Sequence, residues 1–251
     1  MGIGENVNNL FMTVEVEINS SCNKACSYCP NADFKRIEQG HMEESVFRLL
    51  LSQLSDLNFM GALHYHFYNE PLLSPQLESF LSLSKEALPK TKSIIFTNGS
   101  YLTLAKFESL VRAGADKFYI TKHESAQDFI FAETFEKLTE SQKARVVYHQ
   151  YTELHYTNRG GLVEKGPTLN ENYSSRPCYI PATGIVVTLK GNVLTCYEDF
   201  FQKNEMGNIK ERHLREIWNQ ENYKQFRDDL KKGKRVLYEV CKTCNNTKFM
   251  A

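Results

Sequence analysis

The sequence predicts an α/β protein with a partial barrel of TIM type, about five strands and four helices, followed by a small α+β domain with a β-hairpin. Two observations lead to this fold class. Short β-branched and aromatic runs alternate with amphipathic helical stretches over the first 150 residues, and such alternation is typical of parallel strands. After that point the pattern changes to irregular segments that contain glycine, proline and four further cysteines.

The barrel part begins with a strand of alternating apolar and polar residues, which runs directly into a loop with three cysteines. Further strands follow, and the helices between them have apolar residues at i, i+3 and i+4 spacing. The expected strands are residues 12–18, 62–68, 93–97, 117–121 and 145–150, and the expected helices are residues 42–57, 76–87, 104–113 and 126–138.

The C-terminal part has a different organisation. Residues 151–181 are irregular, and residues 183–197 predict a β-hairpin that turns at residues 190–192. Two helices are expected at residues 213–219 and 223–231, and the basic run LKKGKR at residues 230–235 is interpreted as a solvated helix end. We therefore expect two domains, a barrel at residues 1–165 and a second domain at residues 166–251.

The composition argues against nucleic-acid and membrane partners and indicates a cellular location. Lys plus Arg equals Asp plus Glu, so the formal net charge is zero, whereas nucleic-acid binding relies on clustered positive charge. No signal peptide, myristoylation motif or membrane-spanning apolar run is found. We expect a cytoplasmic protein without nucleic-acid or membrane partners, in which reduced cysteines bind metal or take part in catalysis.

The carboxyl ends of the expected barrel strands carry polar and metal-capable groups. These are the cysteine loop, YNEP at 68–71, TNG at 97–99, TKHE at 121–124 and HQ at 149–150. Because strand ends of this kind form the active-site mouth of parallel α/β barrels, we interpret the five loops as one catalytic site. The alternative is that these loops are simply polar and exposed.

The first cysteine set is Cys22, Cys26 and Cys29, with C-x3-C-x2-C spacing. Soft thiolates select iron–sulfur clusters, zinc or Cu(I). A cubane cluster held by three cysteines keeps one iron without a protein ligand, and that iron can bind a substrate or cofactor. A zinc site that takes His41 as its fourth ligand is the alternative.

The stretch CNKACSYC at the end of the first strand resembles the radical S-adenosylmethionine (SAM) superfamily. The resemblance implies that its three cysteines hold a 4Fe–4S cluster, that SAM chelates the open iron, and that cluster reduction cleaves SAM to a 5′-deoxyadenosyl radical. It also implies that Tyr28 packs on adenine and that Glu70 binds the SAM ammonium, with Asn69 in place of the usual glycine. The implied cofactor-binding residues are Tyr28, Tyr68, Asn69, Glu70, Thr97 and Asn98.

The remaining cysteines lie in the C-terminal part and are Cys178, Cys196, Cys241 and Cys244. A C-x2-C pair alone occurs in zinc sites, redox motifs and clusters alike. The four together flank the expected hairpin and resemble the Twitch module, a shortened SPASM domain with one auxiliary 4Fe–4S cluster. Four thiolates ligate such a cluster fully, so that it can pass electrons without binding substrate. Structural zinc is the alternative.

All seven cysteines are used by this assignment, which disfavours radical epimerases and methyl transfer through cysteine because both need a free thiol. A radical whose second electron passes to a nearby cluster suits a two-electron oxidation. The stretches HFYNEPLL, TNRGG and GNVLTCYEDF further resemble the radical SAM dehydrogenases of aminoglycoside antibiotic biosynthesis. These enzymes oxidise a secondary alcohol of an aminocyclitol to a ketone.

This resemblance implies that Arg159 and Glu198 are catalytic residues in contact with an aminocyclitol or amino sugar. It also implies an external one-electron reductant of the flavodoxin or ferredoxin type. Phe96, Lys122 and Tyr197 differ from the tyrosine, glutamine and phenylalanine of that family, which indicates a different cyclitol or amino sugar. The alternatives are a peptide-modifying radical SAM enzyme and a non-catalytic module with two zinc sites.

Overall fold

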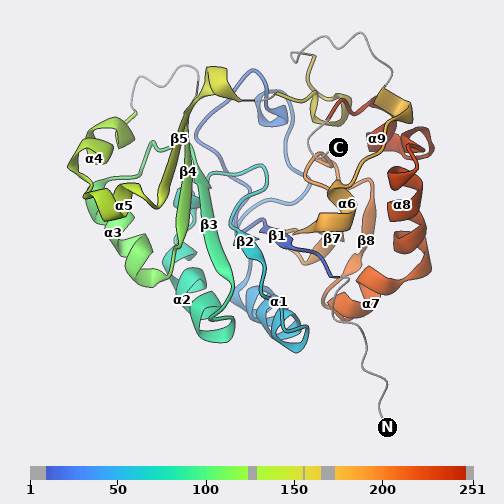
Figure 1. Ribbon diagram of the computed structural model, residues 1–251, viewed down its shortest axis with the longest axis horizontal. Coiled ribbons are helices and arrows are strands. Elements are labelled where there is room, and N and C mark those ends of the chain that lie inside the picture. The colour runs from blue at the N-terminus through green and yellow to red at the C-terminus, as the bar shows by residue number, and fades with distance from the viewer. Residues whose placement is uncertain (1–9, 124–128, 155, 165–172, 247–251) are drawn as a thin grey trace.

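The structure is a computed structural model that describes residues 10–123, 129–154, 156–164 and 173–246. Its centre is a sheet of eight strands in the order β5-β4-β3-β2-β1-β6-β7-β8 (Figure 1). Strands β5 to β6 in this order are parallel, and β7 and β8 run antiparallel to their neighbours. The strands are β1 Thr13–Val16, β2 Ala62–His64, β3 Lys92–Thr97, β4 Lys117–Lys122, β5 Val146–Gln150, β6 Gly184–Val187, β7 Asn192–Leu194 and β8 Glu205–Asn208.

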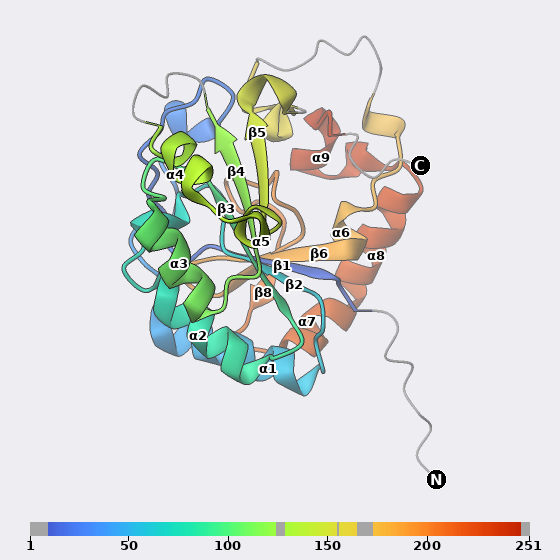
Figure 2. The same cartoon turned by 60° about the vertical axis from the view of Figure 1, so that its left-hand side comes forward.

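Two groups of helices surround this sheet. Helices α1 to α3 lie side by side along strands β1 to β4, whereas α7 packs beside β8 at the other end of the sheet and leads into α8 (Figures 1 and 2). The helices are α1 Glu44–Asp56, α2 Leu77–Ala87, α3 Leu104–Ala113, α4 Phe131–Lys137, α5 Glu140–Lys143, α6 Ile180–Thr183, α7 Leu214–Asn219, α8 Glu221–Lys231 and α9 Glu239–Thr243.

Local sequence explains where these helices begin and end. Thr103 caps α3, because its side chain accepts a hydrogen bond from the backbone N–H of Lys106 at 3.2 Å. Thr139 and Gln142 form a capping box that starts α5 as a separate helix, which the sequence pattern did not predict. The buried positions of α1 follow the i, i+3, i+4 spacing expected from the sequence and are Val46, Phe47, Leu50, Leu51 and Leu54.

The expected order of strands and helices is confirmed, and several elements differ in extent from the expectation. Strand β2 ends at His64 rather than at residue 68, and residues 66–68 form part of the cavity wall. Helix α4 begins at Phe131, and residues 124–128 of that region lie outside the described residues. The hairpin between β6 and β7 turns as expected at Gly191, whose φ of +89° favours glycine.

The hairpin joins the barrel sheet rather than forming a separate one. Strand β6 pairs in parallel with β1, with Thr13 opposite Gly184. Glu38, shortly after the cysteine loop, accepts hydrogen bonds from the Thr188 hydroxyl at 3.1 Å and the Lys190 backbone N–H at 2.9 Å. The two parts of the chain therefore share one sheet, and the domain boundary near residue 165 stays a prediction.

The interpretation of residues 230–235 as a solvated helix end is wrong for its last residue. Arg235 is 1% exposed and donates to the backbone carbonyls of four residues, Arg176, Pro177, Cys244 and Asn246. A fixed fork of donors suits this task, since it satisfies several buried carbonyls at once. Within the described residues, no helix has the length and apolar character needed to cross a membrane.

Candidate active site

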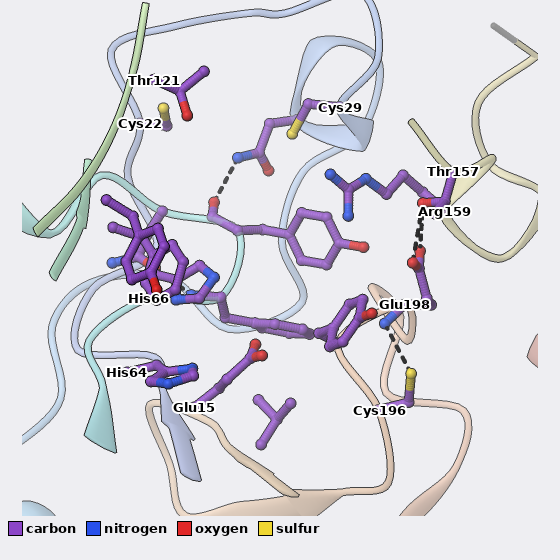
Figure 3. Close-up of a pocket in the computed structure, with 18 of the residues that line it drawn as sticks. Glu15, Cys22, Cys29, His64, His66, Thr121, Thr157, Arg159, Cys196 and Glu198 are labelled. Atoms are coloured by element: carbon purple, nitrogen blue, oxygen red, sulfur yellow. Dashed lines mark hydrogen bonds between the residues drawn. The ribbon is translucent and has the colours of Figure 1, made fainter. Parts of the chain in front are cut away.

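A cavity of about 560 Å³ lies at the carboxyl ends of the parallel strands (Figure 3). It brings together all the predicted cofactor and substrate residues and four of the seven cysteines. These residues are Cys22, Cys26, Tyr28, Cys29, Tyr68, Asn69, Glu70, Thr97, Asn98, Arg159, Cys196 and Glu198. His41, the alternative zinc ligand, is exposed and does not line the cavity, because its backbone forms a bridge with Asn19.

The cysteine loop presents its sulfurs to one wall of this cavity. A backbone hydrogen bond of 2.9 Å from Cys29 N–H to the Cys26 carbonyl turns the loop before the short 3-10 helix Pro30–Ala32. Burial raises the pKa of the Cys22 thiol to about 11, and the charges of the other two cysteines act on it in the same direction. Thiolates are soft ligands, and a bound metal would deprotonate these thiols, so the residue types of this loop fit a soft metal centre.

Glu70 is the buried carboxylate beside the cysteine loop. One of its oxygens accepts from the Thr97 hydroxyl at 2.7 Å and the Leu72 N–H at 3.1 Å, and the other accepts from the Asn98 N–H at 2.8 Å. Burial raises its pKa to about 7, although these hydrogen bonds lower it. The TNG loop thus holds Glu70 in place, and an ammonium group near it would restore its charge.

Asn69 fits this position without backbone strain, because it is not among the described residues with positive φ. Its side-chain oxygen accepts from the Phe67 N–H at 2.7 Å, and its amide nitrogen donates to Asn19 at 2.5 Å. Glycine is therefore not required here. Asn98 donates to Asn23 at 2.7 Å, which ties the TNG loop to the cysteine loop.

Tyr28 lies on the cavity wall and packs against two neighbouring rings. Its ring lies 4.6 Å from the ring of Tyr156, and its hydroxyl is 2.5 Å from Nδ1 of His123 at the end of β4. The β4 loop and the segment after β5 therefore fix the orientation of Tyr28. A flat, apolar face of this kind is suited to stacking against a purine.

Arg159 and Glu198 lie together on another wall of the cavity, as Figure 3 shows. Arg159 stands in a tight turn in which it and the next two glycines all have positive φ, and a Cβ at Gly160 would lie 2.8 Å from Val240. Glu198 is 1% exposed and accepts from the Thr157 hydroxyl at 3.0 Å and the Asn246 amide at 2.7 Å.

The electrostatics of this pair favour a charged guanidinium. Burial alone would lower the pKa of Arg159, but the neighbouring Glu198 raises it above its usual value, as Tyr68 and Cys29 also do. In the described structure, the buried Nε of Arg159 and the buried hydroxyl of Tyr68 have no hydrogen-bond partner. Buried polar atoms need partners, so both groups are available to a polar molecule in the cavity.

The second cysteine set surrounds a smaller cavity next to the first. Cys178, Cys196, Cys241 and Cys244 all line it, together with Glu198 and Arg235. Burial raises the pKa of Cys244 to about 12, and Cys178 also raises it. In the described part of the chain, no group of three or more His, Cys, Asp or Glu side chains is arranged to hold a single metal ion.

Comparisons with known proteins agree with these two sites. The SPASM family model, an iron–sulfur cluster-binding domain, matches residues 178–245, which include the second cysteine set. The chain is 41% identical over 237 residues to the S-adenosyl-L-methionine-dependent 2-deoxy-scyllo-inosamine dehydrogenase of Niallia circulans, covering 94% of each chain. The chain belongs to this family of SAM-dependent dehydrogenases. It is a radical SAM oxidoreductase with an iron–sulfur cluster-binding SPASM domain.

Solved structures support the same family and fold. The crystal structure of BtrN in complex with AdoMet and 2-DOIA matches with a TM-score of 0.90 and 41% identity, over 95% of this chain and 94% of that chain. Native anSMEcpe with bound AdoMet matches with a TM-score of 0.52 and 12% identity, over 92% of this chain and 88% of that chain. The second match shows the fold alone.

The sequence prediction missed the floor of the dehydrogenase cavity. Glu15, His64, His66 and Tyr119 point inward from β1, β2, β4 or the segment after β2, and all line the cavity. Phe96, which the sequence analysis had named as a departure from the family, lies beside them. The Phe96 ring stacks on His66 at 4.3 Å and on Tyr119 at 4.8 Å. A signal was present, because polar residues at alternate positions of a barrel strand face the interior.

The three departures from the family fall in different places. Phe96 and Tyr197 line the cavity, so both can affect the substrate. Lys122 does not line it, since its ammonium lies 5.7 Å from the centre of the Phe129 ring. Burial and the adjacent Cys196 raise the pKa of Tyr197, and its hydroxyl accepts from the Asn246 amide at 2.9 Å. Tyr197 therefore stays a neutral phenol.

Proposed function

We propose that this protein oxidises a secondary alcohol of an aminocyclitol, 2-deoxy-scyllo-inosamine or a close relative, to the amino ketone in aminoglycoside antibiotic biosynthesis. The observation that carries this proposal is the 41% identity to a 2-deoxy-scyllo-inosamine dehydrogenase, which extends over 94% of both chains. The agreement with BtrN in complex with 2-DOIA supports it, since the TM-score of 0.90 covers 95% of this chain.

We propose two cluster sites, and the grouping of the cysteines around two cavities supports them. Cys22, Cys26 and Cys29 line the large cavity and would hold a cluster whose remaining iron faces SAM. Glu70 and Asn98 would contact the amino acid part of SAM, and Tyr28 its adenine. The four cysteines of the second set would hold a fully ligated cluster, and residues 166–251 would form its domain. Two 4Fe–4S clusters amount to about eight irons per chain.

When bound, SAM and the clusters would supply one-electron chemistry that can remove a hydrogen atom from the carbinol carbon and accept the remaining electron. An external reductant of the flavodoxin or ferredoxin type would deliver the electron that cleaves SAM. Because the cysteines must stay reduced to bind clusters, we place the protein in the cytoplasm.

Arg159 and Glu198 hold the reacting alcohol in this proposal. Arg159 keeps its proton, because its pKa is raised, so it donates to the alcohol oxygen and stabilises negative charge that develops there. Glu198 accepts the hydrogen bond of the hydroxyl and takes up the hydroxyl proton as the alcohol is oxidised. Tyr68, whose pKa is raised well above its usual value by burial, stays neutral and packs against the same substrate.

The test uses anaerobically reconstituted protein with SAM, a one-electron reductant and 2-deoxy-scyllo-inosamine. We expect one ketone for each 5′-deoxyadenosine, measured by mass spectrometry. Formation of 5′-deoxyadenosine without ketone from any amino- or hydroxycyclitol would overturn the proposed substrate class. If the protein is instead a peptide-modifying enzyme, the second candidate, we expect 5′-deoxyadenosine without ketone here and a modified peptide when a peptide substrate is supplied.

A further inference from the structure

The interior of the partial barrel contains an acidic residue where barrels are usually apolar. TIM barrels fill their interior with layers of branched aliphatic side chains. Here the corresponding layer of β1 and β2 contains Glu15 opposite His64, which are partners in the parallel register. Because neighbouring strands lie about 4.8 Å apart, these two side chains are neighbours on one face.

Both side chains face the active-site cavity. Glu15 and His64 line it, and Figure 3 shows the Glu15 carboxylate pointing up from the floor with His64 beside it. Arg159 and Glu198 stand on a different wall of the same cavity. A molecule that fills the space between floor and wall meets both groups at once.

The three carboxylates of the cavity occupy different places. Glu70 lies beside the cysteine loop, where it accepts hydrogen bonds from the segment after it and from the TNG loop. Glu198 accepts from Thr157 and Asn246 on the wall that carries the cation Arg159. Glu15 stands on the floor of the cavity, and a carboxylate at such a position favours a cationic ligand.

We infer that Glu15, with His64 beside it, binds the protonated amine of the aminocyclitol and selects an amine-bearing substrate. This inference rests on the proposed function. The amine then faces the barrel floor while the alcohol to be oxidised faces Arg159, so the two polar ends of the substrate fix which carbon reacts. His64 positions Glu15 through their shared strand register, and its ring packs 5.1 Å from Phe96.

The test is equilibrium binding to the SAM-loaded holoenzyme without reductant, so that no turnover occurs. Two ligands are compared, 2-deoxy-scyllo-inosamine and the cyclitol in which a hydroxyl replaces its amine. Glu15→Gln is expected to weaken binding of the amine by about 10- to 100-fold, the range for a charge-assisted hydrogen bond, and to change binding of the hydroxyl analogue by less than about threefold. Glu44→Gln, on the outer face of α1, is the matched control and leaves both affinities unchanged.

Two variants of His64 distinguish its role in positioning Glu15 from a role in folding of the site. His64→Asn keeps a polar side chain at this register position and is expected to retain the preference for the amine, whereas His64→Phe is expected to reduce it severalfold. Unchanged SAM binding in each variant shows that the site is folded. If Glu15→Gln keeps the wild-type ratio of the two affinities, the inference is overturned alone. If the wild-type holoenzyme binds neither cyclitol, the proposed function fails and the inference fails with it.

Discussion

The two cysteine sets differ in how the chain builds them. The first comes from a single loop, Cys22 to Cys29, which lies on the wall of a cavity of about 560 Å³. The second comes from separate segments that close around a much smaller space and are held by the buried Arg235. A local loop can present three sulfurs and keep one side open, whereas a site gathered from distant segments is enclosed. The open first site therefore suits binding of a cofactor or substrate. The enclosed second site suits the acceptance of an electron.

The largest effect is expected from the first set. Cys26→Ala removes one of three sulfurs, and no replacement ligand stands in the same loop. Formation of 5′-deoxyadenosine should fall to background, because SAM cleavage would depend on the cluster proposed for this loop. Liquid chromatography of quenched anaerobic reactions checks it. Cleavage at the wild-type rate would contradict the assignment of this loop.

A loss of ketone with cleavage retained is expected from the second set. Cys241→Ala should lower the iron content from about eight to about four per chain and reduce ketone far more than 5′-deoxyadenosine. The physical reason is that the substrate radical loses its electron acceptor while the SAM site is intact. Iron analysis and product ratios from one reaction measure both. A variant that makes ketone as the wild type does would remove the second cluster from the reaction.

Variants of Arg159 should lower the rate of ketone formation. Arg159→Met is expected to lower the rate of ketone formation by about 10²-fold, typical for one donor that stabilises developing charge. Arg159→Lys keeps the charge but not the fork of donors, so it should recover only part of the rate. Single-turnover kinetics check both variants. Equal rates in Met, Lys and wild-type proteins would contradict contact with the reacting oxygen.

Sequence reasoning found the site residues that stand next to cysteines or at strand ends. Glu70 stands at such a strand end, whereas Arg159 and Glu198 were named through the resemblance to a known family, and all three lie in the cavity. Sequence reasoning missed Glu15 and His64. Alternation along a strand shows which residues share a face, but only the sheet order shows that this face lines the cavity. The β-branched and aromatic runs predicted the strands, but no local pattern showed that β6 pairs with β1.

The missed role of Arg235 has a related cause. The four carbonyls that it satisfies belong to residues 176–177 and to residues 244 and 246, far apart in the chain. A basic run is usually solvated, and only the three-dimensional arrangement distinguishes the buried arginine from its exposed lysine neighbours. The limits of the long amphipathic helices, in contrast, were predictable because their apolar spacing is local, whereas the short helix α5 was missed.

A moderate effect on stability is expected at the turn that joins the two sites. Gly160→Ala places a Cβ 2.8 Å from Val240 at a φ of +67°, so it should lower the free energy of unfolding by about 1–3 kcal/mol. Chemical denaturation of the reconstituted protein measures this change. Gly40→Ala is the control for positive φ without contact, because nothing lies within 4 Å of its Cβ. Equal losses in both variants would show that packing against α9 has no effect.

The smallest effect is a pH dependence of SAM affinity. Burial raises the pKa of Glu70 to about 7, so its carboxylate form grows as the pH rises through that value. SAM should therefore bind more tightly at about pH 8 than at about pH 6, and Glu70→Gln should flatten the profile. Ionisation of Glu70 also lowers stability, since stabilisation present below its unfolded pKa is lost as the pH rises through about 7. A wild-type profile as flat as that of the variant would contradict this role.

The most direct test of the account follows one hydrogen atom. The substrate is 2-deoxy-scyllo-inosamine deuterated at the carbinol carbon to be oxidised, in an anaerobic reaction with the reconstituted holoenzyme and SAM. The account predicts one deuterium in 5′-deoxyadenosine for each ketone formed. Unlabelled 5′-deoxyadenosine accompanied by unchanged cyclitol would contradict it.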